Sequence, residues 1–427
     1  MEDRTYFIWT IGCQMNVGDS RRLAELLATR GYREAEDVES ADLIVLNTCV
    51  VRQSAEDRVL GRLASLKPLK DRRPEVTLAV MGCLVGVDGR DNDLATRFPY
   101  VDLWLPPSSH EQLAELVSER PGRAPTPSPS SVSRYVTIMQ GCDNFCSYCI
   151  VPYRRGRERS RPVGEIVAEV EELASRGARE VTLLGQNVDS YGRDLPGQPS
   201  LAHLLHQVHP VDGIVRLRFL TNHPKDMSQE LIETVAELPK VCEHLELPLQ
   251  SGSDEILKRM NRHYTREQYL ELVQRIKVTI PGVALATDVI VGFPGETRAQ
   301  FQETYDLLEE VGFSAIHVAC YSPRAGTAAA RLEDDVPPEE KEERRRQVEQ
   351  LLERQAGEQN RALLGQTVEV LVEERVRGKW RGRTRTNKLV FLDSPEDLRG
   401  ALVDAVITWT GPWSMQGRLR YSVQAGG

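Results

Sequence analysis

The sequence predicts an α/β protein of three parts: an N-terminal parallel-sheet domain, a partial (β/α)6 TIM-like barrel and a small C-terminal β-barrel. Strand-like runs alternate with amphipathic helical patterns over residues 1–120 and again over residues 134–360, which is typical of parallel sheets with right-handed crossovers. Residues 361–427 instead carry short β-rich runs between turns, typical of a small barrel. A chain of 427 residues is long enough for about three such domains.

In residues 1–120, three strand-like runs each lead to a cysteine. The runs cover about residues 5–10, 43–47 and 76–81, and the cysteines are Cys13, Cys49 and Cys83. The carboxyl ends of parallel strands line one edge of a sheet, so the three thiols should converge there. A single Cys is more often a small buried residue, but three at equivalent strand ends favour a shared metal cluster.

Helical patterns separate these strands. The first carries Leu23, Leu26 and Leu27 on one face, with Asp19 or Ser20 expected as its N-cap and Gly31 at its end. Others cover about residues 53–66 and 109–119. A Pro/Ser-rich stretch without periodicity, residues 121–133, is then expected to be a linker.

Beyond the linker, six strand-like runs predict the partial barrel. They lie near residues 134–139, 179–184, 214–219, 243–248, 283–291 and 315–320. In barrels of the TIM kind the chemistry sits at the carboxyl ends of the strands. A densely charged segment at residues 331–363 follows and is expected to be an exposed connecting helix.

The first barrel strand leads into CxxxCxxC, formed by Cys142, Cys146 and Cys149. Three thiolates this close can hold three irons of a cubane iron–sulfur cluster and leave the fourth iron without a protein ligand. A small molecule can bind an open iron and receive an electron there. The spacing differs from the four-Cys run of ferredoxins and from the paired ligands of structural zinc sites.

Other loops that follow the barrel strands are polar or glycine-rich. The candidate cofactor-binding residues in them are Gly185, Gln186, Asn187, Gln250, Ser251, Gly292 and Glu296. Singly, such residues usually serve turns. Their shared position at one mouth favours a cofactor pocket.

Positive charge is concentrated in two places, although the chain carries −9 overall. Residues 361–427 hold eleven Lys/Arg and seven Asp/Glu, a local net charge of +4. Cations alternate there at Arg375, Arg377, Lys379, Arg381, Arg383 and Arg385, and in extended backbone this periodicity puts them on one face, with Trp380 among them as a stacking candidate. A second run follows the CxxxCxxC and consists of Arg154, Arg155, Arg157, Arg159 and Arg161. Solubility or ion pairing would explain either run, but two concentrated runs in an acidic protein favour contact with nucleic-acid phosphates.

Cysteine usage and hydropathy together predict the cellular compartment of the protein. No apolar run approaches the roughly 18 residues that span a bilayer, and the start of the chain lacks a basic segment followed by a cleavage site. Eight Cys in such a chain are expected to be free or metal-bound in a reducing compartment. We therefore expect a cytoplasmic monomer without a membrane partner.

These motifs together resemble the radical methylthiotransferases, enzymes that use S-adenosylmethionine (SAM), over nearly the whole chain. The resemblance rests on Gly12–Asn16, Asn47–Cys49, Gly82-Cys83, Gly141–Pro162, Leu184–Asn187, Leu247–Ser253 and Val291–Thr297. The C-terminal segment is similar to the family's TRAM RNA-binding domain, and the block Gly141–Pro162 most resembles the bacterial tRNA branch. Leu84-Val85-Gly86 departs from the usual Met-Ala-Gln, which puts that loop's contacts in doubt but not the cluster ligand.

The resemblance implies two [4Fe–4S] clusters and SAM as cofactors. The Cys142/Cys146/Cys149 cluster would bind one SAM, whose reductive cleavage gives a radical able to take hydrogen from C2 of adenine. A second SAM would donate the methyl group, and sulfur would pass through the Cys13/Cys49/Cys83 cluster. The implied substrate is N6-isopentenyladenosine in a tRNA anticodon stem-loop, with flavodoxin or ferredoxin as the kind of electron donor.

Other functions remain open from sequence. Sister enzymes methylthiolate threonylcarbamoyl-adenosine in tRNA, or an aspartate of a small-subunit ribosomal protein. A non-catalytic iron–sulfur RNA-binding protein is the alternative of a different class, for which the cofactor-pocket loops would be superfluous.

Overall fold

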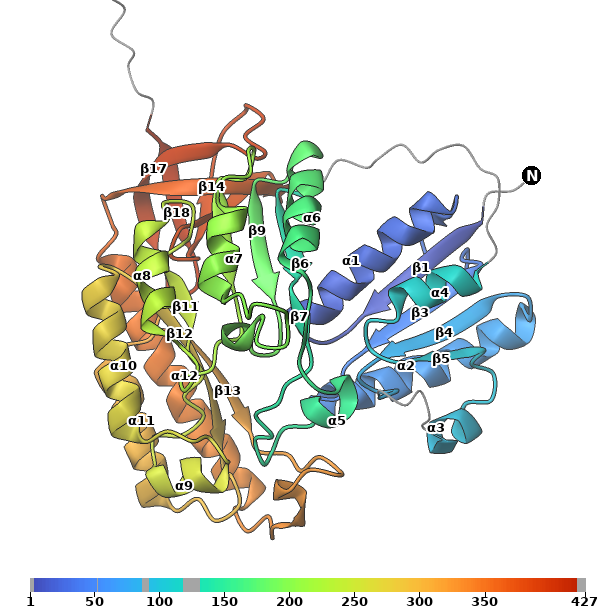
Figure 1. Cartoon of the computed structure of the whole chain (residues 1–427), viewed down its shortest axis with the longest axis horizontal. Coiled ribbons are helices and arrows are strands. Elements are labelled where there is room, and N and C mark those ends of the chain that lie inside the picture. The colour runs from blue at the N-terminus through green and yellow to red at the C-terminus, as the bar shows by residue number, and fades with distance from the viewer. Residues whose placement is uncertain (1–3, 52, 87–91, 118–130, 421–427) are drawn as a thin grey trace, which may run out of the picture.

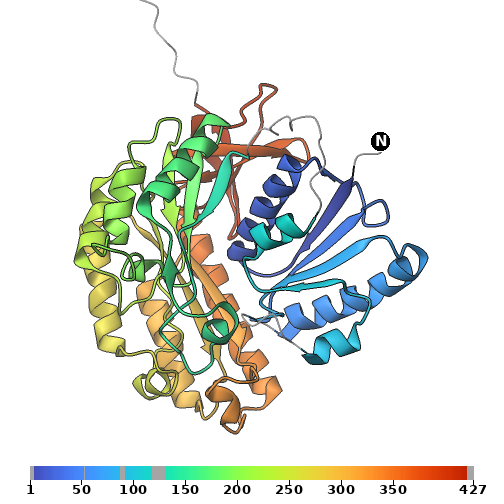
Figure 2. The same ribbon diagram turned by 45° about the vertical axis from the view of Figure 1, so that its right-hand side comes forward.

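Three packed parts make up the computed structural model of the chain (Figures 1 and 2). A parallel sheet with helices on both faces comes first, an open barrel built from two three-stranded sheets follows, and a small closed barrel comes last. The structure describes residues 4–51, 53–86, 92–117 and 131–420. The predicted fold class is confirmed in all three parts.

The N-terminal sheet is parallel, with the strand order β2-β1-β3-β4-β5. Its strands are β1 (Thr5–Thr10), β2 (Arg33–Glu34), β3 (Leu43–Thr48), β4 (Thr77–Gly82) and β5 (Leu103–Leu105), and its helices are α1 (Gln14–Thr29), α2 (Gln53–Arg72), α3 (Asn92–Arg97) and α4 (His110–Leu116). Leu43 and Val45 of β3 pack with α1 and α4, whereas Ile44 and Leu46 pack with α2. A strand buried on both faces needs apolar side chains at successive positions, which explains the unbroken Leu-Ile-Val-Leu run.

The predicted cap of α1 is wrong. The helix begins at Gln14, directly after Cys13, and both Asp19 and Ser20 are buried inside it. Ser20 accepts a hydrogen bond from Asn47 Nδ2 at 2.9 Å, and Asp19 forms an ion pair with Arg155. The two polar side chains therefore serve tertiary contacts, which a cap pattern cannot distinguish from a helix start.

Helix α2 is longer than the sequence predicts. It runs to Arg72 and contains Pro68. Buried Leu66 and Leu69 continue the apolar face that Val59 and Leu63 begin, so packing against the sheet favours the helical path past the proline.

The open barrel consists of two three-stranded parallel sheets, β10-β9-β6 and β11-β12-β13, joined by a parallel bridge between Leu217 and Val241. The strands are β6 (Ser133–Thr137), β9 (Glu180–Leu184), β10 (Arg216–Phe219), β11 (His244–Glu246), β12 (Ala284–Val291) and β13 (Ala315–Cys320). Helices on the outside are α6 (Val163–Ser175), α7 (Leu201–Val208), α8 (Gln229–Glu237), α10 (Arg266–Thr279), α11 (Arg298–Val311) and α12 (Pro338–Arg361). All six predicted barrel strands are present, in chain order around the barrel.

Helix α12 is more deeply buried than predicted. Its Val348, Leu351 and Leu352 belong to the barrel core, and two of its charged residues, Lys341 and Arg344, are also buried. The expected exposed connector is thus an outer wall of the barrel. The sequence did not predict this packing against the core, because the segment is rich in charged residues and its apolar residues form only a narrow stripe of the helix.

The C-terminal barrel is closed, in the order β14-β15-β16-β18-β17. Its strands are β14 (Thr367–Val376), β15 (Lys379–Thr384), β16 (Leu389–Leu392), β17 (Leu402–Thr410) and β18 (Met415–Leu419). Arg218 donates to the carbonyls of Thr384 and Arg385 at 2.9 and 2.8 Å, and Arg216 donates to that of Arg383 at 2.6 Å. Arg216 is the first residue of β10, and the small barrel is docked at the amino ends of the large barrel's strands (Figure 1).

Two expectations concern segments outside these parts. The predicted linker, residues 121–133, falls mostly on residues 118–130, which lie outside the described residues, and its last residue begins β6. Among the helices of the described ranges, none is both long and apolar enough to cross a bilayer.

Candidate functional site

The three N-terminal cysteines follow three neighbouring strands, as predicted. Cys13 comes after β1, Cys49 directly after β3 and Cys83 directly after β4, and these strands are adjacent in the sheet. Cys83 N–H donates to the Thr48 carbonyl at 3.0 Å, which joins two of the three loops. Cys49 and Cys83 are buried, while Cys13 is exposed. The triplet thus lies at one edge of the sheet, partly open to its surroundings.

Two glycines make this convergence possible. Gly12 (φ +132°) and Gly82 (φ +108°) precede Cys13 and Cys83 in backbone conformations that L side chains rarely adopt. A Cβ on Gly12 would lie 2.6 Å from Cys49 Cβ, and one on Gly82 would lie 2.5 Å from the Thr48 carbonyl oxygen. Glycine at both positions therefore lets the cysteine loops approach one another closely.

Two polar residues that the sequence did not single out for this role support the triplet. Asn16 Nδ2 donates to the carbonyls of Ile11 and Thr48, both at 2.9 Å, and so holds the first cysteine loop against the second. Arg155, from the barrel part of the chain, donates from Nε to Cys83 Sγ at 3.3 Å. The structure does not place Arg155 where RNA could reach it, because its side chain is 3% exposed.

The donor set of the triplet fits an iron–sulfur cluster. Burial raises the pKa of Cys49 to about 11 and also raises that of Cys83, so both thiols are protonated near neutral pH and would release protons on binding metal. No set of three or more Cys, His, Asp or Glu side chains in the described ranges converges on a single ion. A cubane cluster does not require such convergence, since each thiolate binds a different iron.

The CxxxCxxC loop is closed at its base by an antiparallel pair, β7 (Met139–Gln140) and β8 (Arg159–Ser160). Gly141 (φ +79°) starts the loop, and a Cβ there would lie 2.0 Å from the Arg157 carbonyl oxygen. The loop then passes through Cys142, Cys146 and Cys149 into the short helix α5 (Val151–Arg155). Burial raises the pKa of Cys142 to about 11 and that of Cys149 to about 12, so this triplet too must lose protons to bind iron.

The loop is also fixed from the far side of the barrel mouth, near α9 (Asp254–Arg259). Ser147 N–H donates to the Met260 carbonyl at 3.0 Å, and its Oγ donates to that of Arg259 at 2.8 Å. Buried Arg262 donates from Nη1 to Cys146 Sγ at 3.4 Å. Sequence reasoning missed Arg262, since nothing local marks an arginine that contacts a thiol 116 positions earlier.

Of the three predicted pocket residues after β9, Gln186 contacts the CxxxCxxC loop, and Gly185 and Asn187 bond to the loop after β10. Gln186 Oε1 accepts a hydrogen bond from Gly141 N–H at 2.6 Å, and the Gly185 carbonyl accepts one from Thr221 Oγ1 at 2.7 Å. Asn187 donates to Asp226 Oδ2, but its buried Oδ1 has no partner within the described part of the chain. Buried polar atoms without a protein partner are expected where a ligand completes the site.

A buried polar cluster continues this lining. His223 Nε2 and Asn222 Oδ1 are likewise buried without a partner among the described residues. Burial raises the pKa of Asp189 to about 7, although His223 N–H and Asn222 Nδ2 donate to its carboxyl group. This unsatisfied polar wall fits a small polar cofactor such as SAM.

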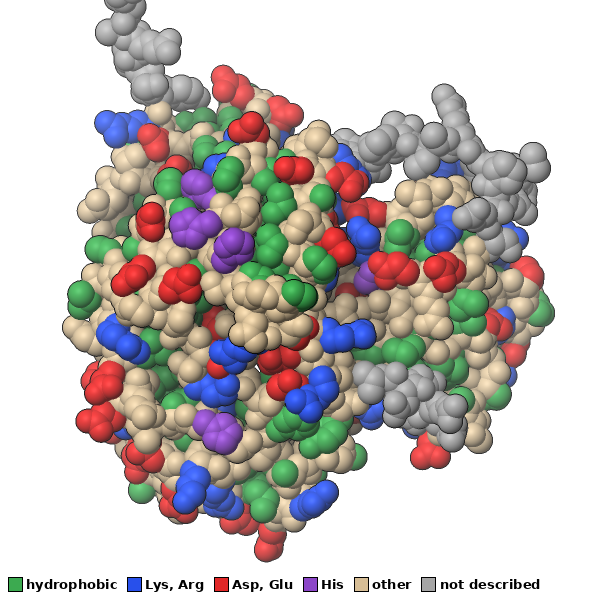
Figure 3. Space-filling view, in the orientation of Figure 1, with side chains coloured by type: hydrophobic (Ala, Val, Ile, Leu, Met, Phe, Trp, Pro, Cys, Tyr) green, Lys and Arg blue, Asp and Glu red, His purple; other side chains and the backbone are tan. Residues whose placement is uncertain are grey.

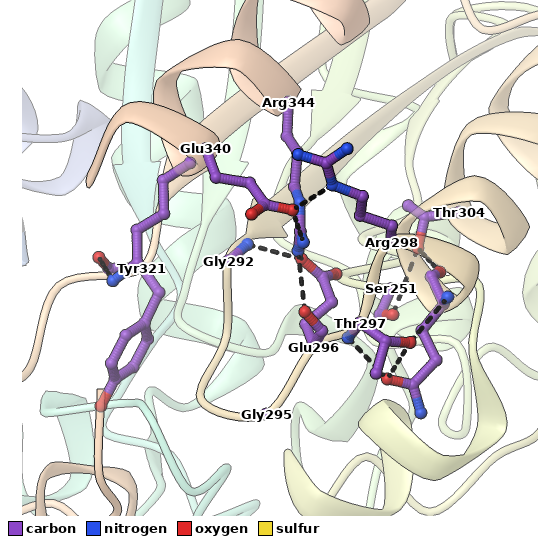
Figure 4. Close-up of polar contacts among 12 residues, drawn as sticks. Ser251, Gly292, Gly295, Glu296, Thr297, Arg298, Thr304, Tyr321, Glu340 and Arg344 are labelled. Carbon is purple, nitrogen blue, oxygen red and sulfur yellow. Dashed lines mark hydrogen bonds and ion pairs between the residues drawn. The ribbon is translucent and has the colours of Figure 1, made fainter. Parts of the chain in front are cut away.

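The pocket residues after β11 and β12 are directed toward other protein groups (Figure 4). Glu296 Oε2 accepts from Gly292 N–H and from Arg344 Nη1, each at 2.6 Å. Ser251 Oγ lies 3.3 Å from Thr304 Oγ1. Glu296 and Ser251 therefore hold their loops, while the buried Glu296 Oε1 has no partner among the described residues.

Gly292 and Gln250 shape the same two loops through their backbone. Gly292 has φ +68°, and a Cβ there would lie 2.3 Å from Lys341 Cγ on α12. Gln250 has φ +69° and exchanges backbone hydrogen bonds with Asp288 and Ile290 of β12. Both residues are thus fixed by chain geometry at the carboxyl ends of the strands.

The alternating cations of the terminal barrel do not form one stripe. A hairpin at Arg377-Gly378 places Arg375 on β14 and the later cations on β15 or beyond it. Trp380 points into the barrel core, and its Nε1 donates to the Glu396 carbonyl, so it is not available to stack on a base. Exposed aromatic rings on this barrel are instead Trp409 and Trp413.

Several of these cations are paired with acids. Arg381 pairs with Glu373 and Glu374, Arg383 with Glu373, and Arg385 with Glu243 of the large barrel. In the other run, exposed Arg157 pairs with Asp143, and half-buried Arg154 donates to the Leu84 carbonyl. On the face of the molecule drawn in Figure 3, acidic and basic side chains are mixed without a large patch of one sign.

Arg375 and Arg377 are exposed, and Lys379 is half-buried. Arg375 lies with its guanidinium 5.8 Å from the centroid of the Trp380 ring, and exposed Arg377 occupies the hairpin turn. Lys379 donates to Gln416. Among the described residues, no acidic side chain forms an ion pair with any of these three.

Comparison with known proteins agrees with this geometry. The model of the Radical SAM superfamily matches residues 136–308, and that of the Uncharacterized protein family UPF0004 matches residues 5–106. Among solved structures, the radical S-adenosylmethionine methyltransferase TsrM from Kitasatospora setae, with cobalamin and a [4Fe-4S] cluster bound, superposes with a TM-score of 0.54. The match has 15% identity and covers 77% of this chain and 74% of TsrM, which establishes likeness of fold.

Fold and cysteine loop together define a radical SAM enzyme, which uses SAM and iron–sulfur clusters, as the sequence predicted. A tRNA-2-methylthio-N(6)-dimethylallyladenosine synthase of Dehalococcoides mccartyi strain CBDB1 is 51% identical over 415 residues, covering 97% of this chain and 98% of the relative. The protein of the same name from Chloroflexus aurantiacus is 50% identical over 97% of this chain and 91% of its own length. The chain belongs to the family of tRNA-2-methylthio-N(6)-dimethylallyladenosine synthases.

Proposed function

We propose that the enzyme adds a methylthio group to C2 of N6-isopentenyladenosine beside the anticodon of tRNA. The observation that carries the proposal is a direct contact between the two parts of the chain that carry the cysteine triplets. Arg155, six residues after Cys149, contacts the Cys83 sulfur of the other triplet. Family membership over nearly the full length supports the choice of this base.

Each triplet has a separate role in this proposal. Cys142, Cys146 and Cys149 would hold the cluster that binds SAM, and Cys13, Cys49 and Cys83 would hold the second cluster. When bound, the first cluster supplies an electron for cleaving SAM, and the second supplies a site for sulfur.

The protein's own groups position and shield these reactants. Gln186 fixes the start of the CxxxCxxC loop, and Arg262 fixes its middle. The unpartnered Asn187 Oδ1 can accept a hydrogen bond from the amino group of SAM. Burial of Cys142 and Cys146 keeps water from the reacting centre.

Turnover on defined RNAs tests the proposal. Anaerobically reconstituted enzyme is given SAM, sulfide, a reductant and an anticodon stem-loop that carries either isopentenyladenosine or threonylcarbamoyl-adenosine. We expect a methylthio mass increment, measured by nucleoside mass spectrometry, on the isopentenylated loop. Turnover confined to the threonylcarbamoylated loop, or to a ribosomal peptide, would assign the chain to a sister activity.

The proposal also includes the electron donor, the cellular compartment and the oligomeric state. The reaction begins with a one-electron reduction, so it requires a donor such as flavodoxin or ferredoxin. With tRNA as substrate, we expect the enzyme to act in the cytoplasm and as a monomer.

Replacing Arg375, Arg377 and Lys379 together with Gln should weaken tRNA binding. These cations have no acidic partner among the described residues, so they are free to meet phosphates. Phosphate contacts carry little sequence information, so affinities for cognate and non-cognate tRNA should fall together. The plot of log K against log salt should become shallower by about 1 for each phosphate that the variant no longer neutralises.

A matched variant on the same hairpin is the control. Arg381 and Arg383 are held by Glu373 and Glu374, so changing both to Gln should weaken binding less. Fluorescence anisotropy across salt concentrations measures both variants. Unchanged affinity in the triple variant would exclude this hairpin from the RNA contact.

A further inference from the structure

Arg155 joins the two cysteine triplets through one side chain. It is the last residue of α5, which begins two residues after Cys149. Its Nε donates to Cys83 Sγ at 3.3 Å, Nη1 to Ser108 Oγ at 3.4 Å, and Nη2 to Asn16 Oδ1 at 3.0 Å. Nη2 also pairs with Asp19 Oδ2 at 3.4 Å. All three guanidinium nitrogens thus contact the N-terminal part of the chain.

Because Arg155 and Asp19 are buried, their charges must leave water when this ion pair forms, which costs desolvation energy. The side chains of Arg155 and Asp19 are 3% and 2% exposed, so neither charge is solvated by bulk water. A buried ion pair is tolerated only when geometry and further hydrogen bonds compensate its desolvation. Lysine could not replace this arginine, because a single ammonium cannot contact a sulfur and three oxygens in fork geometry.

The position of the guanidinium has an electrostatic consequence for a cluster held by Cys83. Each one-electron reduction adds negative charge to an iron–sulfur cluster. A hydrogen bond to a ligating sulfur and a fixed positive charge both stabilise the reduced form, and these are among the factors that set cluster potentials. Asp19, in contact with the same guanidinium, opposes this effect.

We propose that Arg155 is a positioning residue that raises the reduction potential of the Cys13/Cys49/Cys83 cluster and ties the loops that would hold this cluster to α5, the helix that follows the CxxxCxxC loop. The inference rests on the proposed assignment of this triplet as a cluster site, but not on the choice of RNA base. Its effect reaches the neighbouring triplet through α5, because Arg155 cannot shift without moving the helix that follows Cys149.

Redox titration of the second cluster alone tests the proposal. Cys142, Cys146 and Cys149 are first replaced by Ala, so that the electron paramagnetic resonance signal comes from the N-terminal cluster. With dithionite and mediators, Arg155→Met should shift the midpoint potential to more negative values, and Arg155→Lys should shift it less. Arg159→Met, which removes an exposed arginine four residues away, should leave the midpoint unchanged.

The Asp19→Asn variant distinguishes an effect of Arg155 on the reduction potential of the cluster from a purely structural role of Arg155. This variant keeps Arg155 and removes the opposing charge, so its midpoint should move to more positive values. If Arg155→Met fails to hold iron, the Asp19→Asn result decides. An unchanged midpoint in an iron-loaded Arg155→Met variant, or a negative shift in Asp19→Asn, would overturn the proposal. Neither measurement uses RNA, so both can be interpreted even if N6-isopentenyladenosine proves not to be the substrate.

Discussion

Cys146→Ala should abolish reductive cleavage of SAM, with 5′-deoxyadenosine falling to background in anaerobic assays with dithionite. Cys146 supplies one of three thiolates to the cluster with the open iron, and two thiolates are too few to hold it. Arg262 Nη1 would also lose its contact with this sulfur, while Arg262 keeps its bonds to Tyr264 and Pro248. Liquid chromatography of the nucleoside product measures the effect.

The matched variant replaces Cys13, Cys49 and Cys83 with Ala. It should still cleave SAM but form no methylthio product, and it should retain about half of the iron, since one of two cubane clusters remains. Full iron content in this variant would remove the second cluster from the proposal. Cleavage that survives the loss of Cys146 would show that another site holds the SAM-binding cluster.

Arg344→Met should lower the free energy of unfolding by about 3–5 kcal/mol, because it leaves Glu296 as an uncompensated buried carboxylate. Glu296 and Arg344 side chains are 1% and 4% exposed, and the pair ties the Gly292 loop to α12. Urea denaturation of the apoprotein, followed by circular dichroism, measures the loss. Arg346→Met on the same helix breaks an exposed pair with Glu343 and should cost less than about 1 kcal/mol.

The pH dependence of this variant follows from the carboxyl group. Burial raises the pKa of Glu296 above its ordinary value even in the presence of Arg344. Without that arginine the neutral acid is favoured further, so the folded variant takes up a proton more readily than the unfolded chain. The stability deficit relative to the unaltered protein should therefore narrow as the pH falls, and a deficit that widens would contradict the role of Glu296.

The positions of both cysteine triplets could be predicted because they follow from local patterns. Apolar runs mark the strands, alternation with helices makes the sheets parallel, and parallel strands place their carboxyl ends at one edge. Cys13, Cys49 and Cys83 each come next to such an end, so their meeting needs only strand adjacency. Gly12, Gly82 and Gly141 then permit turns that other residues would resist.

Long-range partners of charged side chains could not be predicted in this way. Arg155 and Arg157 lie two positions apart in one run, yet the first is buried against Cys83 and the second is exposed beside Asp143. The sequence does not distinguish the buried arginine from the exposed one, because tertiary packing decides which partner each of them meets. Trp380 was similarly ambiguous, since a ring among cations suits either a base or a barrel core.

The small barrel docks at the amino ends of the large barrel's strands, so it lies at the end of the large barrel away from the cysteine loop. Arg383, Thr384 and Arg385, at one end of β15, are bound by Arg216 and Arg218, while the hairpin with Arg377 lies at the other end, about 20 Å further away. The cysteine loop lies at the opposite ends of the large barrel's strands. Under the proposed phosphate contact at this hairpin, an RNA that touches both regions must extend along the molecule, and binding would then depend on the length of the RNA as well as on one base. Short loops should be able to react while being poorly retained.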